Sequence, residues 1–279
     1  MRPDLQHAGA FRLECPSPNG AATCYLRGRG LSKNFGHVRA LHGVDIEIFG
    51  NEVLAIVGDN GAGKSTLTKI LSGVLQPERG DIFVGEEKVR ISDARRGHEL
   101  GVATVFQTLA LVNCRDVVCN LFLGREPTFW GVFVDRQKML TDARTAFAEL
   151  GVNIPSLSAE AGELSGGQRQ CVAIARATSQ NSRVIIMDEP TAALGVKESS
   201  HVLALILRLK AAGRGVVIIS HNMRHVFSVA DRIMVLRRGT LAGVRRKTET
   251  TEDEIVAMIV GSDALGRAKK EGANQVAGL

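Results

Sequence analysis

The feature that most constrains the fold of this chain is a glycine-rich segment that follows a run of apolar residues. The run, Val53–Val57, is apolar at every position, which is typical of a strand covered on both faces of a sheet. The next residues, Gly58–Thr66, contain the pattern G-x-x-x-x-G-K-S, and a helical stretch through Leu75 follows them. In this order of strand, glycine loop and helix, backbone N–H groups and the helix N-terminus face one point. The segment therefore predicts a phosphate-binding loop in an α/β domain.

The side chains of this loop predict how a nucleoside triphosphate and its metal ion would be held. Lys64 supplies a positive charge to the β- and γ-phosphates, and the Ser65 hydroxyl is suited to ligate Mg²⁺. The glycines let successive N–H groups turn toward the phosphate oxygens. The nucleotide-binding residues expected in the loop are Gly58, Asn60, Gly61, Gly63, Lys64, Ser65 and Thr66.

Other apolar runs indicate the rest of the fold. Similar runs recur at Val102–Phe106, Val184–Met187 and Val216–Ile219, and each leads into a loop. Val44–Ile48 instead alternates apolar and polar residues, as a half-buried strand does. Strands that alternate with helices favour a mainly parallel, doubly wound sheet, which binds its ligands beyond the carboxyl ends of the strands.

The composition divides the chain into three regions. Residues 1–24 are rich in Pro, Gly and Asn and predict a poorly ordered N-terminal extension, 25–260 predict one α/β domain, and 261–279 a polar C-terminal tail. Within the domain, residues from about 109 to 163 show no clear buried strand and one good helix, Arg136–Leu150. We therefore expect an inserted helical subdomain there. No internal repeat is found, so the chain holds one nucleotide-binding unit.

Composition and charge argue against several other kinds of protein. No apolar run reaches the roughly 18 to 20 residues of a membrane-spanning helix, and the first residues do not form a signal peptide. The net charge is +6, but the basic residues are dispersed and do not alternate with aromatic ones, so we expect no nucleic-acid groove. The five cysteines fall at irregular spacings without the pairs of a zinc site, which predicts reduced thiols.

Two adjacent acidic residues follow one of the predicted buried strands. Val184–Met187 delivers Asp188 and Glu189 at its end. Asp188 is placed to hold Mg²⁺, and Glu189 is suited to polarise an attacking water molecule. The alternative is that both residues merely cap the strand, but a nearby nucleotide loop favours catalysis.

A second phosphate-binding surface is predicted at Leu164-Ser165-Gly166-Gly167-Gln168. Ser165 begins a helix, and Gly166 and Gly167 expose backbone N–H groups beside its hydroxyl. One nucleotide needs only one such cradle, so the second is best explained if it serves the nucleotide of another subunit. An ordinary helix cap with a glycine turn is the alternative.

The sequence Leu-Ser-Gly-Gly-Gln between a phosphate loop and an acidic strand resembles the signature of ABC ATPases. The likeness spans about residues 25–260. It implies a P-loop NTPase with a RecA-like core, an antiparallel β subdomain and the helical subdomain, with ATP and Mg²⁺ as ligands. It also implies that two copies sandwich two ATP molecules, each phosphate loop facing the partner's signature, here Ser165, Gly166 and Gly167.

The resemblance also assigns roles to three residues outside these motifs. Gln107 matches the glutamine that senses Mg²⁺ and the γ-phosphate and links to the membrane subunit. His221 matches the switch histidine that contacts the γ-phosphate, and Phe35 matches the aromatic residue that stacks on adenine. The implied catalytic residues are Glu189, His221 and Gln107, and the implied metal ligands are Ser65, Gln107 and Asp188.

Further segments narrow the likeness to ABC importers of monosaccharides. Four segments are similar to the corresponding segments of single-domain ATPases of fructose- or ribose-type systems: Gln107–Val112, Phe122–Glu126, Glu189–Glu198 and Glu254–Gly261. Gly195 departs from the Asp that most ABC ATPases carry, which puts the cooperativity of the two sites in question.

The resemblance predicts the partners and place of the chain. We expect a second copy of itself, transmembrane permease subunits and, indirectly, a periplasmic sugar-binding protein, with the chain peripheral on the cytoplasmic face of the inner membrane. We expect no nucleic acid partner. The alternatives are the ATPase subunit of an ABC exporter, an ABC ATPase that acts on nucleic acid, and a module that has lost hydrolysis.

Overall fold

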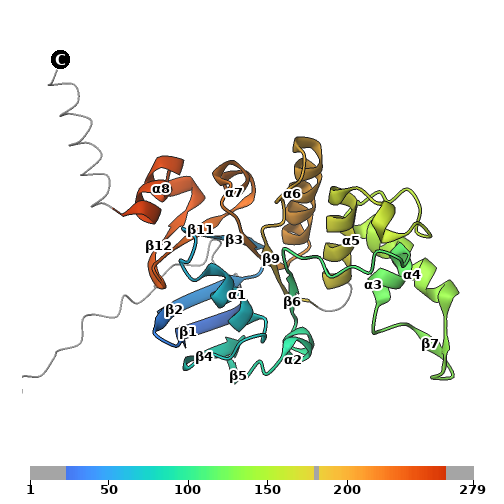
Figure 1. Cartoon of the computed structure of the whole chain (residues 1–279), viewed down its shortest axis with the longest axis horizontal. Helices are drawn as coiled ribbons and strands as arrows, with labels where there is room; N and C mark the ends of the chain where they lie inside the picture. Colours follow the sequence, from blue (N-terminus) through green and yellow to red (C-terminus); the bar gives the residue numbers. More distant parts are fainter. Residues whose placement is uncertain (1–22, 179–181, 262–279) are drawn as a thin grey trace, which may run out of the picture.

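The computed structural model describes residues 23–178 and 182–261, and its elements form three groups (Figure 1). A central six-stranded sheet and its helices form the first, a four-stranded antiparallel sheet the second, and a helical segment at one end of the molecule the third. The expected extension at residues 1–24 and the tail at 261–279 lie almost wholly outside the described residues; of the extension, Cys24 lies in the first strand.

The central sheet has the strand order β12-β11-β3-β10-β9-β6. All its neighbours pair in parallel except β11 and β12. The strands are β3 (Glu52–Val57), β6 (Val102–Val105), β9 (Val184–Asp188), β10 (Gly215–Ile219), β11 (Arg232–Arg237) and β12 (Thr240–Arg246). The predicted doubly wound, mainly parallel sheet is confirmed.

The continuous apolar runs arise because the sheet is covered on both faces. In β3, Leu54 and Ile56 belong to one buried cluster, whereas Val53, Ala55 and Val57 belong to another on the opposite face. Side chains alternate between the faces of a strand, so a strand buried on both sides needs an apolar residue at every position. Each fully buried Ile or Val contributes on the order of 1.5–3 kcal/mol.

The antiparallel sheet covers one of these faces. Its order is β2-β1-β4-β5, with β1 (Cys24–Phe35), β2 (Val38–Phe49), β4 (Arg79–Val84) and β5 (Glu87–Val89). Its buried residues, among them Leu26, Leu31 and Ile46, pack with those of β3 and with helix α1 (Lys64–Leu71). Helix α1 ends before the expected Leu75, because the N–H of Leu75 donates to the carbonyl of Lys69 in a closing turn.

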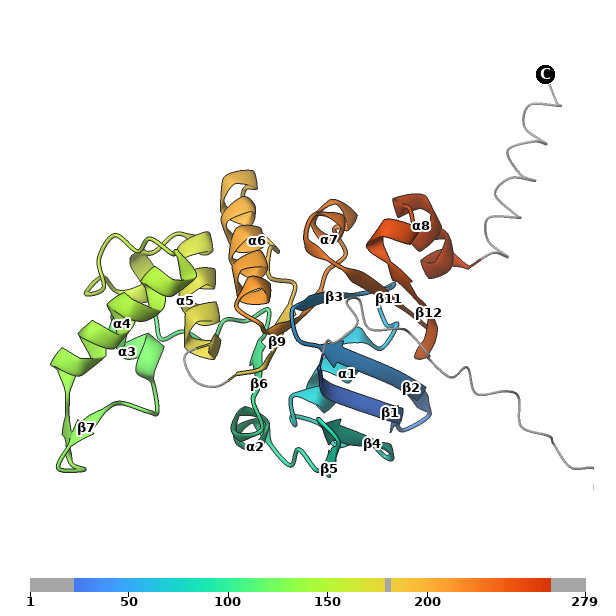
Figure 2. The same ribbon diagram turned by 180° about the vertical axis from the view of Figure 1, so that it is seen from behind.

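Helices cover the other face of the central sheet (Figure 2). Helices α5 and α6 and the shorter α7 pack there against β3, β9 and β10. The remaining helical bounds of this part are α2 (Ala94–Glu99), α5 (Gly166–Thr178), α6 (Val196–Ala211), α7 (Met223–Val229), α8 (Glu252–Val260) and the 3-10 turn Lys247–Glu249. Within residues 23–178 and 182–261, none of the helices is long and apolar enough to cross a bilayer.

The segment predicted as helical holds its own small core. It contains α3 (Val117–Phe122), α4 (Arg136–Leu150), the 3-10 turn Ala161–Glu163 and a short exposed hairpin, β7 (Thr128–Phe129) with β8 (Phe133–Val134). Its buried cluster joins α3, α4 and α5. Helix α4 has the predicted bounds, because Asp135 caps its N-terminus through the N–H of Lys138 and Gly151 ends it in a left-handed conformation.

Candidate functional site

The residues predicted to bind and hydrolyse a nucleotide come together around one cavity of about 470 Å³. The cavity lies beyond the carboxyl ends of β3, β9 and β10, the place expected for a ligand of a parallel sheet. The predicted residues that line it are Phe35, Asn60, Gly61, Gly63, Lys64, Ser65, Thr66, Gln107, Asp188, Glu189 and His221. They come from five separate stretches of the chain, so the fold alone brings them together.

The phosphate loop is fixed by close backbone packing. The φ angle of Gly63 is 100°, and a Cβ atom there would lie 2.5 Å from the carbonyl oxygen of Ala40. A side chain is therefore excluded both by conformation and by space. Gly58 does not line the cavity, but its carbonyl accepts a hydrogen bond of 2.7 Å from Nζ of Lys64.

The charges of Lys64 and Asp188 are held in a partly desolvated place. Lys64 also donates to the carbonyl of Asp59 at 2.9 Å, and burial lowers its pKa. Burial, and then the adjacent Glu189, raise the pKa of Asp188, whereas Lys64 opposes the shift. A partly desolvated cation and carboxylate favour a ligand that offers a negative charge to Lys64 and a positive charge to Asp188, such as a metal-bound phosphate.

The expected catalytic carboxylate is joined to the expected switch histidine. Oε1 of Glu189 lies 2.8 Å from Nδ1 of His221. The N–H of Glu189 donates to the carbonyl of Ile219 at 2.9 Å, which ties the end of β9 to the end of β10. Glu189 has a φ angle of 50°, uncommon for a residue with a side chain, and such conformations concentrate at functional sites.

Three oxygen donors of the cavity fit Mg²⁺. The hydroxyl of Ser65, the amide of Gln107 and the carboxylate of Asp188 all line it. Mg²⁺ prefers oxygen ligands and is usually bound through one or two carboxylates together with phosphate and water. No cluster of three or more His, Cys, Asp or Glu side chains suited to a metal occurs among the described residues.

An exposed aromatic ring stands at the edge of the cavity. The side chain of Phe35 is 48% exposed, and Nζ of Lys33 lies 5.8 Å from the ring centroid. The sequence reasoning missed its neighbours Val38, Arg39 and Ala40, which also line the cavity from the start of β2. No motif in the sequence marked these residues, because the β1–β2 hairpin, in which Phe35 pairs with Val38, brings them to the cavity.

The signature residues lie outside this cavity. Ser165 and Gly167 line a different one, between α4, α5 and α6, and Gly166 lines neither. Oγ of Ser165 accepts from the N–H of Gln168 at 3.3 Å, so Ser165 caps α5 as predicted. In a single chain, therefore, the two predicted phosphate-binding surfaces line different cavities.

A groove runs between the central sheet and the helical segment. Its volume is about 740 Å³, and it is lined by parts of α2, β6 and α5, by the chain after β6 and by the residues that follow α3. Phe106 and Thr108 line this groove, whereas Gln107 between them lines the nucleotide cavity. Arg176 shapes the groove by donating to the carbonyls of Ala110 and Leu109.

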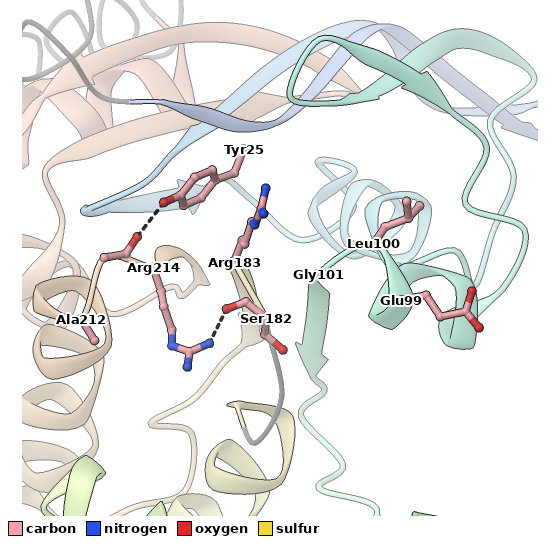
Figure 3. Close-up of a pocket in the computed structure, with 9 residues that line it drawn as sticks. Tyr25, Glu99, Leu100, Gly101, Ser182, Arg183, Ala212 and Arg214 are labelled. Carbon is pink, nitrogen blue, oxygen red and sulfur yellow. Dashed lines mark hydrogen bonds between the residues drawn. The ribbon is translucent and has the colours of Figure 1, made fainter.

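Another cavity, of about 620 Å³, lies at the amino ends of β9 and β10 (Figure 3). Tyr25, Arg183 and Arg214 line it; the Tyr25 hydroxyl donates to the carbonyl of Gly213 at 3.3 Å, and Arg214 donates to that of Ser182. These bonds join β1 to the segment between α6 and β10, and that segment to Ser182, at the amino ends of the central strands. This cavity is therefore separate from the nucleotide site.

Comparison with known proteins agrees with this geometry. The family model described as ABC transporter matches residues 41–192. The chain is 44% identical to the xylose/arabinose import ATP-binding protein XylG of Sulfolobus acidocaldarius over 86% of this chain and 94% of that protein. It is 43% identical to the fructose import ATP-binding protein FrcA of Rhizobium meliloti over 85% of this chain and 94% of that protein.

Solved structures give the same result for the fold. A nucleotide-free ATP-binding cassette from an ABC transporter is 27% identical and superposes with a TM-score of 0.75, covering 87% of this chain and 97% of that one. The dimeric bacterial ABC transporter cassette MJ0796, which is 23% identical, superposes with a TM-score of 0.68, over 80% of this chain and 98% of that one.

Proposed function

Because this chain belongs to the ABC transporter family, as a subunit that binds and hydrolyses ATP, we propose that it drives the import of a monosaccharide. The observation that carries the ATPase assignment is the cavity where the phosphate loop, Asp188, Glu189 and His221 meet. The relatives named as xylose/arabinose and fructose import proteins support the choice of cargo. The sugar itself is chosen by other subunits, since no sugar reaches this chain.

In the proposed reaction the loop amides and Lys64 bind the β- and γ-phosphates, and Phe35 stacks on adenine. Ser65, Gln107 and Asp188 would hold Mg²⁺, which would neutralise charge on the phosphates. Glu189 polarises the attacking water. His221, whose Nδ1 lies 2.8 Å from Oε1 of Glu189, contacts the γ-phosphate and keeps the carboxylate in place. The site is thus organised to stabilise charge and to position water.

A second copy completes each site in this proposal. Ser165, Gly166 and Gly167 do not line the phosphate-loop cavity of their own chain, and a helix N-terminus suits a phosphate. A symmetric dimer would bring each signature to the γ-phosphate of the partner's ATP. The fold that this chain shares with a dimeric cassette is compatible with that arrangement.

The groove beside the helical segment is the proposed seat for a cytoplasmic helix of the permease. Arg95, Arg125 and Arg176 line it, so we expect an acidic residue on that helix. Because Gln107 lies between two groove residues, movement of the permease helix would reach the metal and the γ-phosphate directly. The chain would then work on the cytoplasmic face of the inner membrane, while a periplasmic binding protein delivers the sugar to the permease.

Uptake by a deletion strain tests the importer assignment. In a cell without a duplicate ATPase, removal of the gene should abolish high-affinity uptake of one or a few monosaccharides and leave peptide and metal uptake unchanged. Expression of the wild type should restore uptake, whereas expression of Glu189→Gln should not. Normal uptake of fructose, ribose, xylose and galactose at micromolar supply in the deletion strain would refute import, and an exporter role would replace it.

A further inference from the structure

Helix α6 begins directly against the signature turn of its own chain. A Cβ atom on Gly167 would lie 2.9 Å from Cβ of Glu198, and one on Gly166 would lie 3.0 Å from Cδ2 of Leu194. Cβ atoms essentially never come within 3.0 Å of another atom, so only glycine fits at position 167 without a shift of α6. The two glycines of the turn therefore have a packing role in addition to exposing N–H groups.

The carboxylate of Glu198 joins the two sides of this contact. Its Oε2 accepts from the N–H of Gly195 at 3.3 Å. Hydrogen bonds lower the pKa of Glu198, first one from the Ser165 hydroxyl and then those from the N–H groups of Gly195 and Gly167. The side chain of Glu198 thus bonds the residue before α6, packs against Gly167 of the signature turn and lines one cavity with Ser165.

The chain between Glu189 and α6 is folded into a tight, hydrogen-bonded turn. Glu189 and Ala193 have φ angles of 50° and 58°, both in the left-handed region that side chains disfavour. The N–H of Ala192 donates to the carbonyl of Glu189 at 3.0 Å, and Oγ1 of Thr191 lies 2.9 Å from Nδ1 of His225.

We propose that Glu198 is a positioning residue, which orients the Ser165–Gly167 turn for the ATP of the partner copy. Glu198 lines the cavity beside the signature and not the nucleotide cavity of its own chain, so it acts through the turn. The inference rests on the composite site proposed above.

Dimer formation in a hydrolysis-deficient background tests this role. Full-length Glu189→Gln is expected to form an ATP-bound dimer, whose dissociation constant can be measured by sedimentation with saturating MgATP. Adding Glu198→Ala should weaken that dimer by about tenfold, within the usual range of coupling between sites. Adding Glu198→Gln, which keeps an acceptor oxygen, should restore the parent value.

The controls separate positioning from folding and from nucleotide binding. Glu198→Ala removes one cap of α6, so it should lower the melting temperature of the nucleotide-free protein by only about 2–4 °C. It should leave the ATP affinity of the dilute monomer unchanged. Glu252→Ala, at an exposed acidic residue in the first turn of α8, should not affect the dimer. If the parent dimerises with ATP and Glu198→Ala dimerises equally well, the role of Glu198 is overturned. Equal weakening by Ala and Gln would overturn it too. If the parent itself stays monomeric with ATP, the composite site fails instead.

Discussion

At the scale of single residues, the candidate site depends on side chains that hydrogen bonds hold in place and on charges that are partly desolvated. Glu189 is held between the carbonyl of Ile219 and the ring of His221, while Asp188 and Lys64 are partly desolvated. These groups have different tasks, so their substitutions should affect binding and hydrolysis differently.

Removing the charge of Glu189 should separate ATP binding from hydrolysis. Glu189→Gln keeps the shape of the side chain but no longer polarises water, so the steady-state rate of phosphate release should fall by about 10²- to 10⁴-fold. Its ATP affinity, measured by titration calorimetry, should stay near the wild-type value. Lys64→Ala should show the opposite pattern, with weakened ATP binding. Near-normal turnover in Glu189→Gln would contradict the assignment of the catalytic carboxylate.

Asp188 should destabilise the nucleotide-free protein while serving the metal. Its pKa is raised on folding, so the folded state holds its proton more tightly than the unfolded state does. Its effect on stability is therefore absent below the unfolded pKa, near 3.9, and becomes a cost as the pH rises through the folded pKa. Asp188→Asn should melt at a higher temperature than the wild type at pH 7, with a smaller difference toward pH 4, and should lose Mg²⁺-dependent ATPase activity. A lower melting temperature at pH 7 would contradict this account.

The sequence indicated which residue types the candidate site needs better than it indicated which residues contact one another there. Patterns such as G-x-x-x-x-G-K-S fix both residue type and local geometry, so Lys64 and Ser65 could be placed without coordinates. Arg39 and Glu198 could not, because their positions depend on a hairpin and on a helix contact that no local pattern encodes.

At the scale of elements, a buried ion pair lies within the central sheet, and its arginine also bonds the antiparallel sheet. Arg232, at the start of β11, donates to both carboxylate oxygens of Glu52 and, at 2.7 Å, to the carbonyl of Glu47 in β2. Arg232 and Glu52 are 4% and 1% exposed. The guanidinium also lies 4.9 Å from the ring centroid of Phe49, so it is packed as well as paired.

Breaking this pair should destabilise the whole fold. Arg232→Ala leaves a buried carboxylate without a partner, which typically costs about 3–5 kcal/mol, measured by urea unfolding. The double variant Arg232→Met with Glu52→Leu removes both charges and should be considerably more stable than Arg232→Ala. An Arg232→Ala variant within about 0.5 kcal/mol of the wild type, the usual range for a surface change, would contradict the role of this pair.

The elements were predictable where one local rule governed them. The apolar runs predicted the bounds of β3, β6, β9 and β10 to within one residue at each end, because a strand buried on both faces requires an unbroken apolar run. The end of α1 was predicted too late, since a closing turn at Lys69 and Leu75 ends the helix without a change in hydrophobic pattern. The antiparallel sheet was expected only from the resemblance, because its strands are half-buried and irregular in register.

At the scale of the whole molecule, the chain presents half of each proposed ATP site. The phosphate loop and Glu189 face one cavity, and the signature turn faces elsewhere. The groove next to Gln107 supplies a route from a permease to that cavity. The central claim is therefore that hydrolysis needs two copies, each completing the other's site.

Mixed dimers of two inactive variants test this claim most directly. Lys64→Ala disables the phosphate loop and Ser165→Arg blocks the signature, so each homodimer has two damaged sites. In a heterodimer purified through two different tags, one interface carries both defects and the other carries neither. We predict that the heterodimer recovers about half of the wild-type ATPase rate per dimer while both homodimers stay near the background rate. A heterodimer no more active than either homodimer, beside a wild-type monomer whose specific activity is independent of concentration, would contradict the account.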